Sequence, residues 1–419
     1  MRKLLPLVSM FLLSSNTLAS DFNLPFVNAS QLGTLYADWA TYANDASTAY
    51  TNPAGLVKLP YQQLVFAGVG LTGNTTFKGT AVTPPFPFPL TIQQTGRASS
   101  DIHAFMPSFY YALPINPQMT FALGVTAPFG LGTTYEKDSL VRYLATRSQV
   151  VGIDIGPSFG FKVNDYLAIG AGFDALHLSF TLNNMYGPPL SIPDAQLRNK
   201  EHGWGYGWHG GVLLDLDACT RIGFSYNSKI AIHAKGYSEV ILPYPGPEFR
   251  TKDQKTHAIL PERAQLSAQR DFTNRFTAMV TIFYTNWRTF KELTLQNTMT
   301  PFDITIPVTI PFNYHNTWDY AIGATFKATE QWLLRAGVMF MDTPSNNHDR
   351  GVADPIGKAV IVGLGAQYKQ NAALQYEIGI AHSFFKNMPV DLTTPLTSLT
   401  GKTHAQTNLI GVQVTWNIC

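Results

Sequence analysis

Charged residues are scarce in this chain of 419 amino acids. Asp, Glu, Lys and Arg make up 13% of it, against about 25% in a typical soluble domain. The mean hydropathy is nevertheless close to zero, at -0.01, so uncharged polar residues are abundant. The formal net charge of +2 argues against a nucleic-acid partner. No shift in composition divides the chain into separate domains.

The first residues have the pattern of a secretory signal peptide. Two basic residues at positions 2–3 precede an apolar run over 4–13, and small residues occupy the cleavage positions within 17–19. The apolar run is too short to span a bilayer, which takes about 20 residues. We therefore expect residues 1–19 to be cleaved off during export.

Residues 20–60 lack the alternating pattern of a strand and are expected to form short helical turns and irregular chain. The segment carries several aromatic residues, such as Tyr36 and Trp39, whereas disordered tails are poor in them. It is therefore predicted to be a plug, or hatch, inside the fold that follows. The alternative is a disordered tail.

From residue 61 onwards the sequence predicts antiparallel strands. In 374–384 the even positions are apolar or amphipathic and the odd ones polar or small, which requires one apolar and one polar environment. Segments of this kind recur about fourteen times, a number within the range of bacterial outer-membrane barrels. They cover 61–77, 99–113, 118–135, 146–162, 166–182, 203–215, 219–240, 256–271, 274–292, 313–327, 331–342, 358–369, 372–386 and 402–418. We predict an all-β fold: a transmembrane antiparallel β-barrel over residues 61–419.

The connections between these segments alternate between short and long. The short ones lie at 113–117, 162–165, 215–218, 271–274, 327–330 and 369–372. Bacterial outer-membrane barrels have short periplasmic turns and longer outer loops. The chain is therefore expected in a bacterial outer membrane, with outer-membrane lipid around it. Cys219 and Cys419 suit no metal framework, and both a disulfide between them and two free thiols stay open.

The third predicted strand contains Pro128, Phe129 and Gly130. Proline removes a donor from the hydrogen-bond ladder and glycine permits bent backbone. The tripeptide predicts a local break in the wall, which could be an opening or an ordinary bulge near the rim. A turn is predicted at Asn52, Pro53 and Ala54 in the hatch. It is either a plug element beside the wall break that moves when ligand arrives or a purely structural turn.

Two predicted outer loops are unusually apolar, and exposed apolar clusters often mark binding surfaces. Their candidate ligand-binding residues are Met185, Tyr186, Leu190 and Ile192 in one loop and Ile241, Leu242, Tyr244 and Phe249 in the other. The alternative is that the two loops only pack against each other.

A carboxylate inside an apolar cavity needs a cationic partner, because burying an unpaired charge is costly. Arg142 is the first candidate, followed by Lys358 and Arg350; each could also be an ordinary rim charge. Residues 173–182 contain neither Lys nor Arg, so a neutral hydrocarbon ligand stays open.

Several stretches together resemble a known family. They are 44–56 with its Asn-Pro-Ala triplet, 142–143 with 157–164, 204–212, 260–262 with 284–290, and 335–344. In this order they resemble the FadL-type outer-membrane transporters of long-chain fatty acids and other hydrophobic compounds (the OMPP1/FadL/TodX family). The resemblance implies a fourteen-stranded barrel with an N-terminal hatch. It also implies an outer hydrophobic groove that captures ligand, and lateral exit into the membrane through a strand kinked at 128–130.

Other functions are less well supported by the sequence. A general porin or surface adhesin is the main alternative, and an outer-membrane lipid hydrolase is a weaker one. The sequence has no phosphate-binding glycine loop, no HExxH and no GxSxG motif, and its histidines are scattered. We therefore expect no enzyme activity, no metal and no cofactor.

Overall fold

The computed structural model describes residues 24–83, 91–186, 194–243, 245–355, 357–394 and 397–418. The predicted signal peptide, together with Leu190, Ile192, Tyr244 and Cys419, lies outside the described residues.

Strands dominate the structure. They are β1 (Gln62–Thr83), β2 (Ile92–Asn116), β3 (Met119–Thr134), β4 (Arg147–Lys162), β5 (Leu167–Tyr186), β6 (Ala195–Asp215), β7 (Thr220–Asn227), β8 (Ile230–Ile241), β9 (Glu248–Leu260), β10 (Arg263–Asp271), β11 (Phe276–Thr285), β12 (Glu292–Met299), β13 (Thr305–Pro311), β14 (Thr317–Lys327), β15 (Trp332–Met341), β16 (Ala359–Lys369), β17 (Leu374–Phe385), β18 (Met388–Thr393) and β19 (Ser398–Ile418). The described helical turns are α2 (Thr48–Thr51), η2 (Pro53–Lys58) and η3 (Trp287–Thr289). Among these residues no helix has the length and apolar character needed to cross a membrane.

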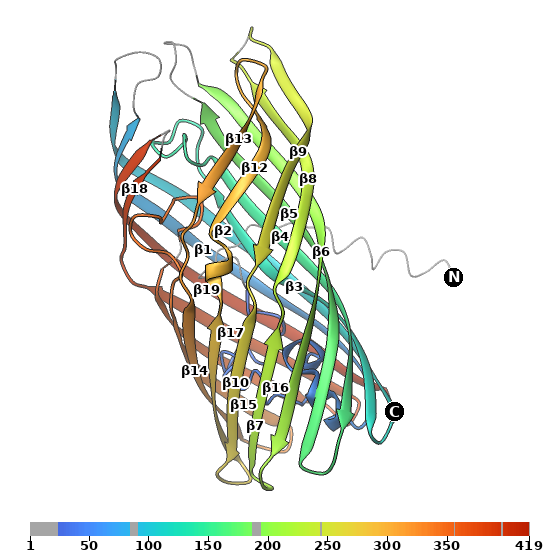
Figure 1. Cartoon of the computed structure of the whole chain (residues 1–419). Coiled ribbons are helices and arrows are strands. Elements are labelled where there is room, and N and C mark those ends of the chain that lie inside the picture. Colours follow the sequence, from blue (N-terminus) through green and yellow to red (C-terminus); the bar gives the residue numbers. More distant parts are fainter. Residues whose placement is uncertain are drawn as a thin grey trace.

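The strands close into an antiparallel barrel, because β1 pairs with β2 on one side and with β19 on the other (Figure 1). Some strands are interrupted and run as two pieces: β7 with β8, β9 with β10, β11 with β12, β13 with β14, and β17 with β18. Counting each pair once gives the predicted fourteen strands, so the prediction of fold class is confirmed.

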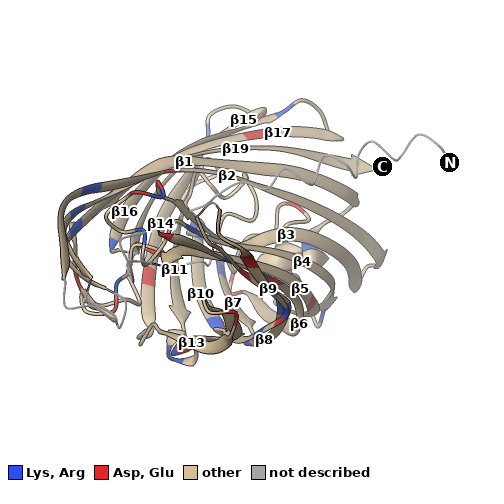
Figure 2. Cartoon of the chain, turned by 90° about the horizontal axis from the view of Figure 1, so that it is seen from above, with Lys and Arg blue, Asp and Glu red and all other residues tan. Residues whose placement is uncertain are grey.

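The predicted alternation separates the two faces of the wall. In β17, Ile378 and Ile380 are 48% and 50% exposed, whereas Glu377, Gly379 and Ala381, which alternate with them, are buried. Exposed apolar side chains of this kind recur around the barrel and form the face that lipid would cover. Charged residues are thinly spread over the wall when the barrel is viewed from above (Figure 2).

The N-terminal segment, residues 24–60, lies inside the ring of strands, in the half that carries the tight turns (Figure 1). Trp39 and Tyr36 are almost fully buried there. The wall holds the segment through inward-facing polar side chains: Gln413 Oε1 accepts from the backbone N–H of Ala29, and Ser267 Oγ accepts from that of Ala40. The segment therefore fills part of the barrel interior.

The two rims differ as expected from the connections. The turns between β4 and β5, and between β16 and β17, are tight, while the opposite rim carries longer connections (Figure 1). Cys219 lies at the tight turn between β6 and β7, where its thiol is exposed and free.

Candidate ligand-binding site in the barrel wall

The two edges of β2 are paired very differently. Its edge toward β1 is paired without interruption from Ala112 opposite Gln63 to Ile92 opposite Thr83. Its edge toward β3 is paired only from Phe109 to Asn116. Residues 92–108 of β2 and 126–134 of β3 therefore face each other without a hydrogen-bond ladder. We call this break in the wall the β2–β3 gap.

The gap begins where β3 is irregular. Between Thr126 and Phe129, two residues of β3 stand opposite a single residue of β4, which is a β-bulge. One of the two is Pro128, which has no N–H to donate to a ladder. Beyond the bulge, β3 has a ladder only with β4, and the backbone N–H of Thr134 donates to Ser100 Oγ of β2 across the gap at 2.8 Å. The tripeptide 128–130 predicted to break the wall thus lies at the start of the gap.

A cavity of about 790 Å³ lies at the gap. Its apolar lining comes from both sides of the gap and from the lumen, and includes Phe105, Met106, Val125, Phe129, Val150 and Leu24. Phe105 is 52% exposed on the outer face, whereas Leu24 is buried inside the barrel. The cavity therefore has linings on both faces of the wall.

The N-terminal segment reaches the bulge itself. The backbone N–H of Leu24 donates to the carbonyl oxygen of Pro128 at 2.8 Å. This contact places the first described residue of the segment beside the gap, so a movement of the segment would change the cavity lining.

The other end of the cavity is polar and cationic. Arg147, Arg198 and Lys200 line it, on β4 and β6. Arg198 is paired with Glu239 at 3.3 Å, and Arg147 donates to the side-chain oxygen of Gln149. Neither Arg147 nor Lys200 has a carboxylate partner among the described residues. The sequence analysis did not single out these cations, because they face a common cavity only through the strand register.

Arg142, the predicted carboxylate partner, is already occupied. Its Nε lies 2.6 Å from Asp194, and its guanidinium also donates to Gln94 and to the hydroxyl of Tyr143. Burial raises the pKa of Tyr143 to about 12, so its hydroxyl stays protonated and bonds the same aspartate. Arg142 joins the loop before β4 to the ends of β2 and β6 and does not line the cavity described above.

The two secondary candidates are also engaged near the rim. Lys358 pairs with Asp342 at 2.8 Å, and Arg350 donates to the carbonyl oxygen of Pro389 at 2.7 Å.

The apolar residues predicted in outer loops lie partly on strands, which corrects the expected strand ends. Met185 and Tyr186 end β5, Ile241 ends β8, and Phe249 lies in β9. Polar residues continue to pair beyond the lipid-facing band, where alternation no longer marks a strand. Tyr186, Leu242 and Phe249 pack around one buried cluster that contains Val240 and Met299.

The Asn-Pro-Ala turn is fixed against the wall. The side-chain amide of Asn52 donates to the carbonyl oxygens of Ala40 and Val212, and its oxygen accepts from the N–H of Ala54. A Cβ at Gly170 would lie 2.3 Å from the carbonyl carbon of Pro53. Only glycine permits this close approach, so the turn and β5 fit together at this position.

A Ser–His–Asp arrangement that the sequence analysis did not find lies inside the barrel. Ser158 Oγ is 3.0 Å from His209 Nε2, and His209 Nδ1 is 2.7 Å from Asp174. Both Ser158 and His209 also contact the carbonyl oxygen of Ala49, at 3.1 and 2.9 Å. Ser158 is completely buried. Its hydroxyl is thus directed at the protein's own backbone, and the arrangement attaches the N-terminal segment to the wall.

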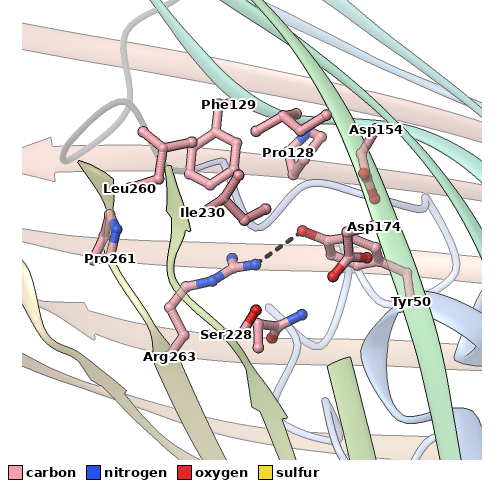
Figure 3. Close-up of a pocket in the computed structure, with 12 residues that line it drawn as sticks. Tyr50, Pro128, Phe129, Asp154, Asp174, Ser228, Ile230, Leu260, Pro261 and Arg263 are labelled. Atoms are coloured by element: carbon pink, nitrogen blue, oxygen red, sulfur yellow. Dashed lines mark hydrogen bonds between the residues drawn. The ribbon is translucent and has the colours of Figure 1, made fainter. Parts of the chain in front are cut away.

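A second polar contact attaches the N-terminal segment to the wall near the bulge. Arg263 on β10 donates to the hydroxyl of Tyr50 at 2.9 Å, with Asp154 and Asp174 on the neighbouring wall (Figure 3). The described residues contain no group of three or more His, Cys, Asp or Glu side chains that could hold a metal ion.

Comparison with known proteins identifies the family. Residues 10–417 match the model of the outer membrane protein transport protein family, OMPP1/FadL/TodX. The chain belongs to this family. It is therefore an outer-membrane transport protein rather than an enzyme, as the sequence analysis predicted.

Named relatives cover nearly the whole chain. Outer membrane protein P1 of Haemophilus influenzae is 24% identical, over 89% of this chain and 88% of the relative. A long-chain fatty acid transport protein of Escherichia coli O6:H1 is 22% identical, over 90% and 89%.

Solved structures share the fold. A Pseudomonas aeruginosa FadL homologue superposes with a TM-score of 0.83 at 24% identity, covering 95% of this chain and 99% of the other. The Pseudomonas putida toluene transporter TodX gives a TM-score of 0.68 at 15% identity, covering 92% and 98%.

Proposed function

We propose that the protein takes up hydrophobic small molecules, either long-chain fatty acids or hydrophobic aromatic compounds, and releases them sideways through the β2–β3 gap. Two relatives carry names of this kind, a long-chain fatty acid transport protein and a toluene transporter. A cavity of about 790 Å³ is of the size that holds small ligands, which is roughly 300–1,000 Å³.

The observation that carries the proposal is the end of the β2–β3 ladder at Phe109. A barrel exposes no unpaired edge to lipid without a reason, because lipid cannot satisfy free backbone groups. Beside Phe109 the gap is lined by apolar side chains such as Met106, Val125 and Phe129, and it continues to the outer face at Phe105. A hydrophobic molecule could pass there without entering water.

In this proposal the N-terminal segment acts as the hatch. Residues 24–60 fill the part of the lumen near the tight turns, so a straight path through the barrel is obstructed. The attachments at Ala49 and Asn52 hold the segment, and its contact at Pro128 links it to the gap. Ligand binding beside Leu24 would displace that end of the segment.

Capture is assigned to the apolar cluster at the outer rim, where Tyr186, Leu242 and Phe249 pack around Met299. For a fatty acid, we propose Arg147 and Lys200 as the partners of the carboxylate. They line the cavity and lack a carboxylate partner among the described residues, whereas Arg142 is engaged by Asp194.

The test removes the bulge and so restores the register. Deleting Ala127 and replacing Pro128 by Thr leaves one residue opposite one, so β3 can pair with β2 along its length. The matched control deletes Asn297, since β12 has a bulge of the same kind between Leu295 and Thr298. Both variants are checked for barrel folding by heat-modifiable electrophoresis.

Uptake of a radiolabelled long-chain acid and of toluene is then measured in cells that lack other transporters of this family. Uptake by the bulge-free variant should be at least about tenfold lower than that of the wild type, because its exit is closed. Uptake by the control variant should be unchanged. Unchanged uptake by a folded bulge-free variant would refute lateral release. Large ionic conductance of the wild type in planar bilayers would favour a porin instead.

A further inference from the structure

A row of three cations crosses the outer face of the barrel beside the gap. Lys78 on β1 stands directly opposite Lys402 on β19 and Arg97 on β2. Neighbouring strands are about 4.8 Å apart, so the three side chains start within roughly 10 Å of one another. All three are exposed.

None of these cations has an ion-pair partner among the described residues. The ion pairs of the described residues include none of Lys78, Arg97 and Lys402. Like charges directly opposite each other on neighbouring strands are destabilising. The row therefore has an unfavourable arrangement that an external anion would relieve.

Hydrogen-bonding side chains border the cation row on both sides. On the side of the outer rim, the hydroxyls of Thr80 and Thr95 are hydrogen-bonded at 2.9 Å. On the side of the membrane, those of Thr76 and Ser99 are hydrogen-bonded at 3.0 Å. His404, which lies opposite Thr76 on β19, continues the second row. Hydroxyl and imidazole groups around a row of cations suit a ligand that carries both anionic groups and sugar hydroxyls.

The height of the row matches the polar headgroups of the outer leaflet. The lipid-facing band on these strands reaches Phe105 and Ile410, which are 52% and 54% exposed and lie opposite Gly70. Lys78 lies eight residues further along β1, which at about 3.3 Å per residue and a tilt of about 45° puts it roughly 20 Å higher. The row therefore lies above the acyl chains.

We propose that Lys78, Arg97 and Lys402 bind the phosphorylated sugar headgroup of lipopolysaccharide in the outer leaflet. The cations contact its phosphate or acidic sugar groups, and the flanking threonines, serine and histidine contact its hydroxyls. Bound there, the lipid covers the paired side of β2 and leaves the gap side to the transported ligand. This surface is separate from the cavity residues of the proposed function.

The test measures lipopolysaccharide binding by the purified, detergent-solubilised, affinity-tagged protein. The probe is rough-type lipopolysaccharide with a phosphorylated core, and bound lipid is quantified by its fatty-acid content after capture. The triple variant K78Q/R97Q/K402Q is compared with R270Q/R275Q/K369Q. The latter removes as many positive charges from the opposite rim, at the turns between β10 and β11 and between β16 and β17.

The triple variant of the patch should bind at least about tenfold more weakly, and the control variant should bind as the wild type does. Dephosphorylated lipopolysaccharide should bind the wild type with a similar loss, and this arm needs no folded variant. Millimolar inorganic phosphate should not displace the lipid. Wild-type affinity in the patch variant, an equal loss in the control, full binding of the dephosphorylated lipid, or displacement by phosphate alone would overturn the proposal.

Discussion

The two edges of β2 differ in their pairing, since one continues the wall and the other borders the β2–β3 gap. Toward β1 the register is unbroken from Ile92 to Ala112, and the outer face near the outer rim carries hydroxyls and cations. Toward β3 the ladder stops at Phe109, and the apolar side chains of Phe105, Met106 and Phe129 line the cavity beside this point. The difference lies in the partner strand, since β1 is regular whereas β3 contains a bulge at Pro128. A barrel can thus acquire a lateral gap through a local change in one strand while the remaining ladders keep it closed.

The largest effect on ligand uptake is expected from a bulky side chain that fills the cavity at the β2–β3 gap. Gly130 lines the cavity, so Gly130→Trp should occupy it and lower ligand uptake by roughly tenfold or more. The control is Gly70→Trp on the paired side. Gly70 has no atom closer than 3.6 Å to an added Cβ, so the new side chain has room on the outer face. Initial uptake rates of a radiolabelled long-chain acid test this. Equal rates for both variants would remove the distinction between the two edges.

Replacing the cations on the gap side of β2 should have a smaller effect on uptake, and this effect should depend on the ligand. R147Q/K200Q should lower uptake of a fatty acid by about fivefold, because the carboxylate loses partners that are partly screened by water. Uptake of neutral toluene should stay unchanged. The matched pair on the other side, K78Q/R97Q, should leave uptake of both ligands unchanged. Competition assays with the two labelled ligands measure these differences, and a parallel loss for toluene would argue against a carboxylate site.

The architecture could be predicted from the sequence alone. Alternation in segments such as 374–384 is a local property and predicted both the strands and their outward faces, and the fourteen-stranded barrel confirms that prediction. The irregularity at Pro128 was also predictable, because a missing N–H disrupts a ladder wherever it falls.

Other features depend on relations between distant residues. The cavity brings Arg147 and Lys200 together through the register of β4, β5 and β6, and a one-residue slip would turn such side chains to the other face. Strand ends such as Met185 were misplaced because pairing continues where lipid no longer imposes alternation. Interruptions such as the one between β11 and β12 allow η3 to form within the wall, and no simple periodicity marks them.

The most direct test of lateral release is to locate a transported ligand by photo-crosslinking. A long-chain acid with a diazirine near its methyl end would be added to cells that carry the protein, and adducts would be mapped by mass spectrometry. We expect adducts on the gap lining, at Phe105, Val125 and Phe129. Adducts confined to the inward-facing residues near the tight turns, with none on the gap lining, would contradict lateral release.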